Sequence, residues 1–428
     1  MNLLDAFNSF NQQVPVLDIW DIRRNEALRS LEKTGWPTRK NETWKYTNLQ
    51  ALKSLALKYA VQAPAIPAAT QELLPGFHHI IFNDGVLKSV PQNVPGLQVV
   101  ELRQALVAKS GPWTKWMGRW EADLLKLRKE KDFTEHVSEA FMDSGVCIQV
   151  DPNTKLDQPV QIAFFNSGSA SANFSSTQVW IDLGAGSRSD LVLTSTGNDL
   201  QINQTQIWAH PNSKTTFLKY GELRAEKSDF QRVEVQIEAN AEFDSWSVGL
   251  GGRLQRNELE LFIKGSGVTA NAWGVSLASG TTVLDHHTLI DHVVGGSRSE
   301  QLYKGILSDE SRVVFDGAVH IRPGADKASS EQLNKNLILN GTAEVDSKPQ
   351  LQVLADDVKA THGSATGQMS DEELFYFQSR GISLAESKRL LATGFVMDLI
   401  ERHPVESVRK LIFSRLKTAF DRSWEQVK

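Results

Sequence analysis

Residues 140–368 are dominated by short runs in which apolar and polar side chains alternate. Examples are "VCIQV" (146–150), "RVEVQIEA" (232–239) and "RVVFDGAVHI" (312–321). A period of two predicts half-buried β-strands. The later runs recur about every 14 to 18 residues, and no helical pattern of useful length separates them. This arrangement argues against an ordinary βαβ sheet and indicates an all-β core.

Two architectures fit this spacing: antiparallel hairpins in a sandwich, or parallel coils in a solenoid. Asn-Gly hairpin signals are scarce, because the dipeptide occurs only at residues 340–341. The length and regularity of the β-rich region favour a solenoid, in which each coil covers its neighbour's edge. Spacing by itself leaves both architectures open.

The regions on either side are helical, which divides the chain into residues 1–139, 140–368 and 369–428. In the first region, residues 21–35 have a helical pattern that Gly35 can end. Trp113, Trp116 and Trp120 share one helical face, which predicts core packing. In the last region, Ser370 is placed to cap a helix beginning "DEELFYF".

Composition narrows the function classes. The 428 residues carry a net charge of −5, with no basic stripe to attract nucleic acid. No run approaches the roughly 20 apolar residues of a membrane span, and the N-terminus has no signal-peptide pattern, so we expect a cytoplasmic protein. The single cysteine, Cys147, excludes an internal disulfide and cannot by itself hold an iron–sulfur cluster. Its apolar run predicts a buried small side chain.

The common motifs of catalysis are absent from the sequence. There is no phosphate-binding loop, nucleophile elbow or zinc-binding H-E-x-x-H helix. His286, His287 and His292 form the densest histidine group. On one strand His286 and His287 point to opposite faces, and His292 lies about 20 Å from His286. These histidines therefore predict structural or surface roles rather than a metal site.

The stretch "ADDVKATHGSATGQ" (355–368) combines acidic, basic and small residues. Asp356 and Asp357 are adjacent, so strand alternation would send them to opposite faces. That is poor geometry for the paired carboxylates of a carbohydrate-active β-helix enzyme, which is the alternative function for this chain. His362 is the residue in this stretch best suited to chemistry.

Two segments carry a family resemblance. "GWPTRKNETWKYTNL" (35–49) and "AEVDSKPQLQVLADDVKATHGSATGQMSDEELFYFQSRGI" (343–382) resemble the signatures of the SufB/SufD family of the SUF iron–sulfur cluster assembly system. With "FNDGVL" and the β-rich middle, the resemblance covers essentially the whole chain. It implies a mainly β fold: a right-handed parallel β-helix core (140–368) flanked by an N-terminal mixed helical domain (1–139) and a C-terminal helical domain (369–428).

The resemblance also implies a role and partners. The chain is expected to be a non-catalytic scaffold subunit that pairs with SufB through the β-helix and with the ATPase SufC through the C-terminal helices. Clusters would be assembled at the SufB interface. The resemblance implies no cofactor held stably by this chain alone, a transient iron–sulfur cluster shared with SufB, and ATP bound only by SufC. A homodimer of the isolated chain is a further expectation, since exposed strand edges pair readily.

Particular residues follow from the matched motifs. His362 is the candidate cluster or metal ligand at the SufB interface. Gly363 follows it where SufB-type members carry an acidic residue, which favours the SufD branch. Ala360 stands where several SufD relatives have a cysteine, so no thiolate ligand is available there. The expected SufB-facing residues are Asn336, Leu351, Val353 and Lys359. The expected SufC-docking residues are Phe375, Tyr376 and Arg380.

Overall fold

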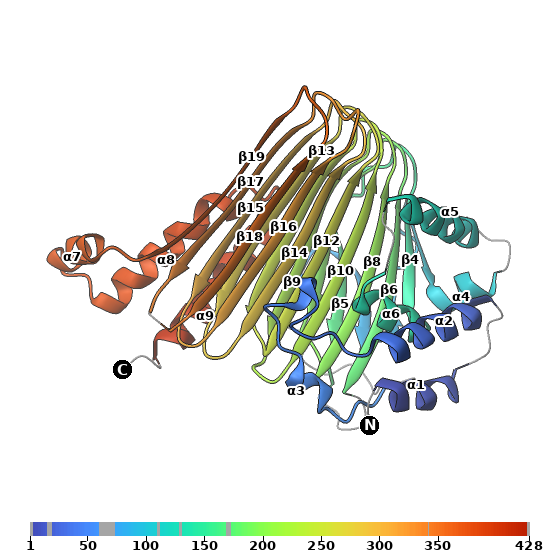
Figure 1. The fold of residues 1–428 in the computed structure, drawn as a ribbon, viewed down its shortest axis with the longest axis horizontal. Helices are drawn as coiled ribbons and strands as arrows, with labels where there is room; N and C mark the ends of the chain where they lie inside the picture. The colour runs from blue at the N-terminus through green and yellow to red at the C-terminus, as the bar shows by residue number, and fades with distance from the viewer. Residues whose placement is uncertain are drawn as a thin grey trace.

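The fold is a two-sheet parallel β-solenoid with helices on its outer faces (Figure 1). The structure is a computed structural model that describes residues 3–14, 19–59, 73–108, 112–127, 131–167, 173–340 and 342–425. From residue 145 onward, successive strands alternate between the two sheets, and each pairs in parallel with the strand two positions further along the chain up to the last coil. The solenoid alternative is therefore confirmed over the hairpin sandwich.

Sheet A contains the even-numbered core strands together with β3. Its order is β18-β16-β14-β12-β10-β8-β6-β4-β3. The bounds are β3 (Leu97–Glu101), β4 (Gly145–Val150), β6 (Phe174–Leu183), β8 (Leu200–Ala209), β10 (Ser228–Ile237), β12 (Leu254–Ile263), β14 (Val283–His292), β16 (Arg312–Ile321) and β18 (Glu344–Val353).

Sheet B contains the odd-numbered core strands together with β1 and β2. Its order is β19-β17-β15-β13-β11-β9-β7-β5-β1-β2. The bounds are β1 (His78–Asn83), β2 (Val86–Ser89), β5 (Val160–Phe165), β7 (Arg188–Ser195), β9 (Lys214–Leu223), β11 (Glu242–Gly251), β13 (Thr269–Ala278), β15 (Arg298–Leu307), β17 (Ser329–Ile338) and β19 (Lys359–Gln368).

The predicted spacing has a simple structural origin. From β12 to β19 the strands start every 14 to 17 residues, and consecutive strands belong to opposite sheets. One coil therefore spans two strands, so Leu254 pairs with Val283 and Val283 pairs with Arg312. Strands β1 to β3 precede residue 140 but join the same two sheets. The sheets thus extend into the N-terminal region.

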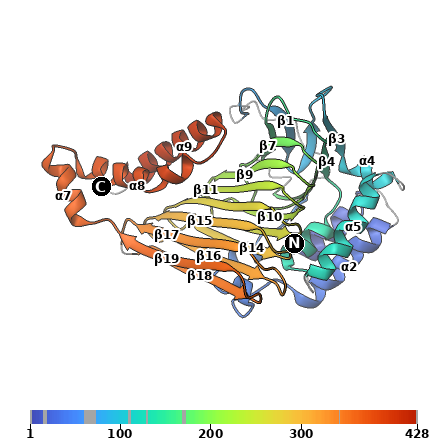
Figure 2. The same ribbon diagram turned by 90° about the horizontal axis from the view of Figure 1, so that it is seen from above.

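Buried apolar side chains form three layers, one between the two sheets and one on the outer face of each sheet. Inward-facing residues of both sheets, such as Ile181 and Phe217, form the apolar interior of the solenoid. The N-terminal helices pack on the outer face of sheet A from β4 to β14, and α8 (Leu384–Ile400) and α9 (Glu406–Glu425) pack on the outer face of sheet B (Figure 2). Between the sheets and across both outer faces, alternating side chains of each central strand are buried, which explains the near-continuous burial of β8 and β10.

The N-terminal helices are α1 (Leu3–Asn11), α2 (Ile19–Thr34), the 3₁₀ turn η1 (Glu42–Trp44), α3 (Gln50–Lys53), α4 (Leu102–Val107), α5 (Pro112–Leu127) and α6 (Phe133–Ala140). Gly35 ends α2 as predicted, with a φ of 63° and its N–H bonded to the Leu31 carbonyl at 2.7 Å. Trp113, Trp116 and Trp120 are buried against Trp180 and Trp208 of sheet A, which confirms the predicted core face.

The C-terminal helices are α7 (Asp371–Ser379), α8 (Leu384–Ile400) and α9 (Glu406–Glu425). The Ser370 hydroxyl caps α7 by accepting from the Glu373 N–H at 3.4 Å. Val396, Leu399 and Ile412 dock α8 and α9 onto sheet B, whereas no residue of α7 is buried. In both ribbon views α7 extends away from the sheets (Figures 1 and 2). None of the described helices has both the length and the apolar character to span a bilayer.

Candidate functional site: the terminal coil of the solenoid

Strands β18 and β19 form the last coil, and each is the outermost strand of its sheet. β18 has no buried residue, and neither has β19. Val353 is 38% exposed, although its register partner Ile321 is fully buried in the core, and the adjacent Leu354 is 55% exposed. The terminal coil therefore presents core-type side chains and two free strand edges, which are templates for pairing with another chain.

His362 lies on the inward face of this coil. It pairs with Gln332 of β17 in the parallel register, and strand alternation places it on the same face as Ala360, which packs against the solenoid interior. His362 is nevertheless exposed. It is thus an inward-face side chain of the outermost coil, and Ala360 is its neighbour on the same face.

The two aspartates do not lie where alternation predicted. Asp356 and Asp357 occupy the turn between β18 and β19 rather than a strand, and both are exposed. The prediction that they point to opposite faces of a strand is therefore wrong. A surface turn offers no groove in which the two carboxylates would flank a sugar, so the carbohydrate-active alternative gains no support.

The other residues expected to face SufB separate into two groups. Leu351 and Val353 lie on β18, and Lys359 lies at the start of β19, so all three belong to the terminal coil. Asn336 is a correction. It lies on β17, one strand inside the edge, is only 3% exposed, and donates to the Asn334 side chain at 2.7 Å. β19 covers its strand, because Asn336 pairs with Thr366.

Helix α7 carries the residues expected at the SufC surface. Phe375 is 71% exposed and Tyr376 is 54% exposed, so neither is a core residue in this chain. The Arg380 guanidinium lies 4.6 Å from the Tyr376 ring centroid, close enough for a cation–π contact. The acidic residues in the first turn of α7, Asp371, Glu372 and Glu373, complement the helix dipole.

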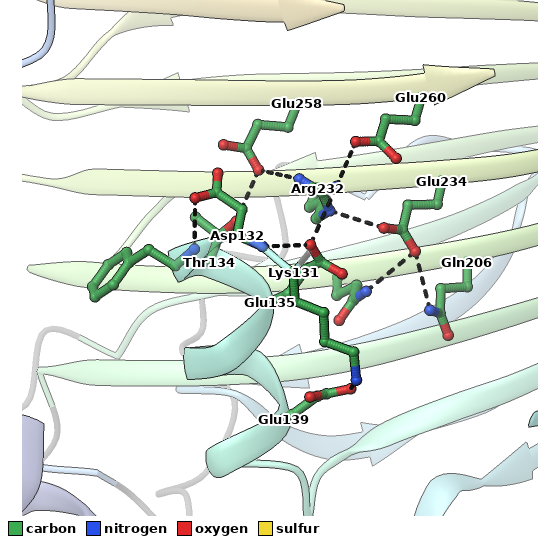
Figure 3. Close-up of polar contacts among 12 residues, drawn as sticks. Lys131, Asp132, Thr134, Glu135, Glu139, Gln206, Arg232, Glu234, Glu258 and Glu260 are labelled. Atoms are coloured by element: carbon green, nitrogen blue, oxygen red, sulfur yellow. Dashed lines mark hydrogen bonds and ion pairs between the residues drawn. The ribbon is translucent and has the colours of Figure 1, made fainter. Parts of the chain in front are cut away.

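Sequence reasoning did not find a charged network on the outer face of sheet A (Figure 3). Arg232 contacts Glu234 at 2.9 Å, Glu258 at 2.8 Å, Glu260 at 2.6 Å and Glu135 of α6 at 3.4 Å. Burial disfavours the charged form of Glu258, but Arg256 and Arg232 outweigh it and hold its pKa well below the usual range. Alternating charges in "RVEVQ" and "RNELE" were the available signal.

The same network reaches the N-terminal signature. The Arg256 guanidinium lies over the Trp44 ring and donates to Asp285 at 2.7 Å, while the Thr47 hydroxyl also donates to Asp285. Lys348 of β18 donates to Glu42 at 2.5 Å. A cleft of about 450 Å³ lies among these charges. The signature therefore holds the N-terminal region on sheet A and contacts the terminal coil.

The histidine group is dispersed, as predicted. His286 points inward and contacts the Ser276 hydroxyl at 2.7 Å, whereas His287 points outward to Asp285 at 2.9 Å. His292 contacts Ser297 and Ser299 inside the solenoid. Within the described residues, no three His, Cys, Asp or Glu side chains are grouped to hold a metal ion.

The fold and this coil define a helix-flanked parallel β-solenoid whose terminal strands are exposed. Family comparison is more specific: residues 164–395 match the SUF system FeS cluster assembly, SufBD core domain, and residues 5–162 match the SufBD protein N-terminal region. The chain belongs to the SufBD family.

Curated relatives support this assignment. The chain is 26% identical over 406 residues to the iron-sulfur cluster assembly protein SufD of Escherichia coli (strain K12), covering 91% of each chain. It is 25% identical over 415 residues to protein ABCI7, chloroplastic, of Arabidopsis thaliana, covering 90% of this chain and 83% of that one. It is also 25% identical over 281 residues to SufD of Bacillus subtilis (strain 168), covering 64% of each.

Proposed function

We propose that this chain is the SufD-type scaffold subunit of a cytoplasmic SufB–SufC–SufD complex. The exposure of His362 on the inward face of the terminal coil carries this proposal, because an inward side chain is normally covered by the next coil. The names of the Escherichia coli and Bacillus subtilis relatives, and the "HGSATG" form of the motif, support the SufD type.

In this proposal SufB supplies the missing layer. Its β-solenoid meets β18 and β19, so that Val353 and Leu354 are buried and the free edges are paired. The iron–sulfur cluster is the cargo of the interface rather than a resident cofactor. Neutral imidazole is a suitable iron ligand, so His362 contributes one ligand and SufB contributes thiolates. A thiolate from this chain is excluded, because Cys147 is buried on β4.

SufC supplies the energy in this scheme. It docks on α7 and the neighbouring helices, where Phe375 and Tyr376 are exposed and Arg380 adds a charge. ATP binding brings two SufC subunits together, and the C-terminal helices transmit this motion to sheet B through their apolar docking surface. The SufB interface near His362 then opens. The chain acts as a scaffold in this mechanism and performs no bond chemistry of its own.

The test is co-expression with SufB and SufC, followed by anaerobic cluster loading of the purified complex. His362→Ala should lower the iron and sulfide content while the complex keeps its mass and stoichiometry. His78→Ala is the matched control, because His78 lies on β1 near the opposite end of sheet B. Full cluster content in His362→Ala would exclude direct ligation, and failure to co-purify with SufC would contradict the scaffold assignment.

A further inference from the structure

His362 has a buried glutamine directly beside it. In the β17–β19 register Gln332 pairs with His362, and both side chains point into the solenoid. Neighbouring strands lie about 4.8 Å apart, so in-register side chains on one face are within hydrogen-bonding reach of each other. Gln332 is only 1% exposed, which places its amide between the protein interior and the exposed imidazole.

Gln332 is the outer member of a short hydrogen-bonded ladder. Its Nε2 donates to Gln301 Oε1 at 2.7 Å, and Gln301 Nε2 donates to the Thr288 hydroxyl at 2.5 Å. Gln301 occupies the equivalent position one coil further in, since it pairs with Gln332 between β15 and β17. The Gln332–Gln301 bond runs along the solenoid axis, the Gln301–Thr288 bond crosses from sheet B to sheet A, and together they orient the nitrogen ends of both amides.

The Gln332 amide is closely held at its nitrogen. Gly317 of β16 makes room for it, because a Cβ at this glycine would lie 2.7 Å from Gln332 Nε2. Within the described part of the chain, Gln332 Oε1 has no hydrogen-bond partner. A buried carbonyl without a donor is energetically unfavourable, so it attracts a nearby N–H. Gln332 Oε1 is therefore the ladder acceptor that still lacks a donor, and its residue pairs directly with His362.

We propose that Gln332 is the positioning residue of His362: when the imidazole turns inward from its exposed position, the unpartnered Gln332 carbonyl accepts one ring N–H, a bond absent from the structure as described, and thereby fixes the tautomer. The other ring nitrogen then keeps its lone pair and is held toward the mouth of the solenoid. A hydrogen bond to one nitrogen sets the role of the other in metal-binding histidines generally. The use of that lone pair for iron rests on the proposed function, whereas the tautomer itself does not.

The tautomer is measurable in the isolated chain. Long-range proton–nitrogen correlation spectra of the ¹⁵N-histidine-labelled protein, recorded above the histidine titration range, report which ring nitrogen carries the proton. His362→Gln identifies the signal. We expect one dominant tautomer in the wild type, and a threefold to tenfold shift of the tautomer ratio in Gln332→Leu, the effect of losing one hydrogen bond of ordinary strength.

Two variants separate positioning from simple damage. Gln332→Glu retains an acceptor at the same place, so it should keep the dominant tautomer. Gln350→Leu makes the same substitution at an outward-facing glutamine of β18 and should leave the His362 signal unchanged. An unchanged tautomer ratio in folded Gln332→Leu would overturn the proposal, as would loss of the dominant tautomer in Gln332→Glu.

Cluster loading then distinguishes this inference from the proposed function. In the assembled complex, Gln332→Leu should retain a cluster content between those of the wild type and His362→Ala. If His362→Ala loads fully, the proposed function fails while the tautomer result stands. If His362→Ala fails to load and Gln332→Leu loads like the wild type, the positioning role fails while the ligand role stands.

Discussion

The guanidinium carbon of Arg256 lies 3.7 Å from the centroid of the Trp44 ring, although the two residues belong to different structural layers. Arg256 also donates to Glu258 at 2.7 Å and to Asp285 at 2.7 Å. A tryptophan of the N-terminal signature therefore covers a buried ion network of sheet A. This contact joins the N-terminal signature to β12, which lies far from it along the chain.

Removing Arg256 should strongly destabilise the fold. Arg256→Met leaves Glu258 and Asp285 buried with fewer positive partners, so we expect the free energy of unfolding to fall by about 3–5 kcal/mol. Urea titration followed by tryptophan fluorescence measures this change. Arg298→Met, at an exposed arginine of sheet B, should stay within about 0.5 kcal/mol of the wild type. Equal effects of the two variants would contradict the importance of the buried network.

Buried histidines should weaken the fold in mild acid. Burial lowers the pKa of His286 to about 3 and the pKa values of His292 and His403 to about 4. The unfolded chain takes up protons near pH 6.5 while the folded chain does not. The three neutral histidines therefore contribute fully to the free energy of unfolding above about pH 6.5. As the pH falls toward 4 this contribution is lost, and three such groups lower the free energy of unfolding by up to about 4 kcal/mol per pH unit. Urea midpoints from pH 7 to 4.5 measure this slope, and His286→Gln should reduce it.

His210 should have the opposite dependence. Burial lowers its pKa, but hydrogen bonds to Asp182 and Glu238 outweigh this and raise it to about 9. The contribution of protonated His210 to the free energy of unfolding is complete below about pH 6.5 and is lost as the pH rises through about 9. Urea midpoints should therefore decline between pH 7 and 9.5. The decline should flatten in His210→Gln, and an unaltered alkaline slope in that variant would count against the assignment.

Cys147 should be unreactive in the folded chain. It lies on β4 with no exposed surface, and burial raises the pKa of its thiol well above the usual value. A thiol-specific chromogenic reagent should react rapidly in urea and negligibly under native conditions. Cys147→Ala should load clusters in the complex as the wild type does. Loss of cluster content in this variant, at unchanged stability, would reveal a role for sulfur that burial disfavours.

Helix α7 should contribute to binding without contributing to stability. Phe375→Ala removes a side chain that is 71% exposed, so the urea midpoint should not change. If Phe375 is an anchor of the SufC surface, the same substitution should weaken SufC binding at least fivefold in calorimetry, the effect of about 1 kcal/mol. Val107→Ala on α4 is the matched control, because Val107 is also exposed, at 59%, and lies outside the C-terminal helices. Equal losses of SufC affinity in both variants would contradict an anchor role for Phe375.

Local features were readable from the sequence because they depend on neighbours along the chain. Alternation predicted strands such as β4, β10 and β16, and the capping residues Gly35 and Ser370 predicted where helices end or begin. The spacing of Trp113, Trp116 and Trp120 predicted a buried face. Each of these signals arises within one or two turns of backbone, where side-chain periodicity and backbone hydrogen bonding are local.

The site required the tertiary structure. A period of two is the same for a hairpin sandwich and a solenoid, so only the parallel pairing decided between them. Asn336 was expected at the exposed edge of the solenoid. Which strand is outermost depends on whether a further coil stacks on it, and β19 covers the strand that holds Asn336. Likewise, Arg232 meets Glu135, Glu234, Glu258 and Glu260 only after the coils stack and α6 docks. The sequence by itself determined the strands, the helix ends and His362 as a candidate. The stacking of residues about one coil apart decided which side chains became exposed, paired or buried.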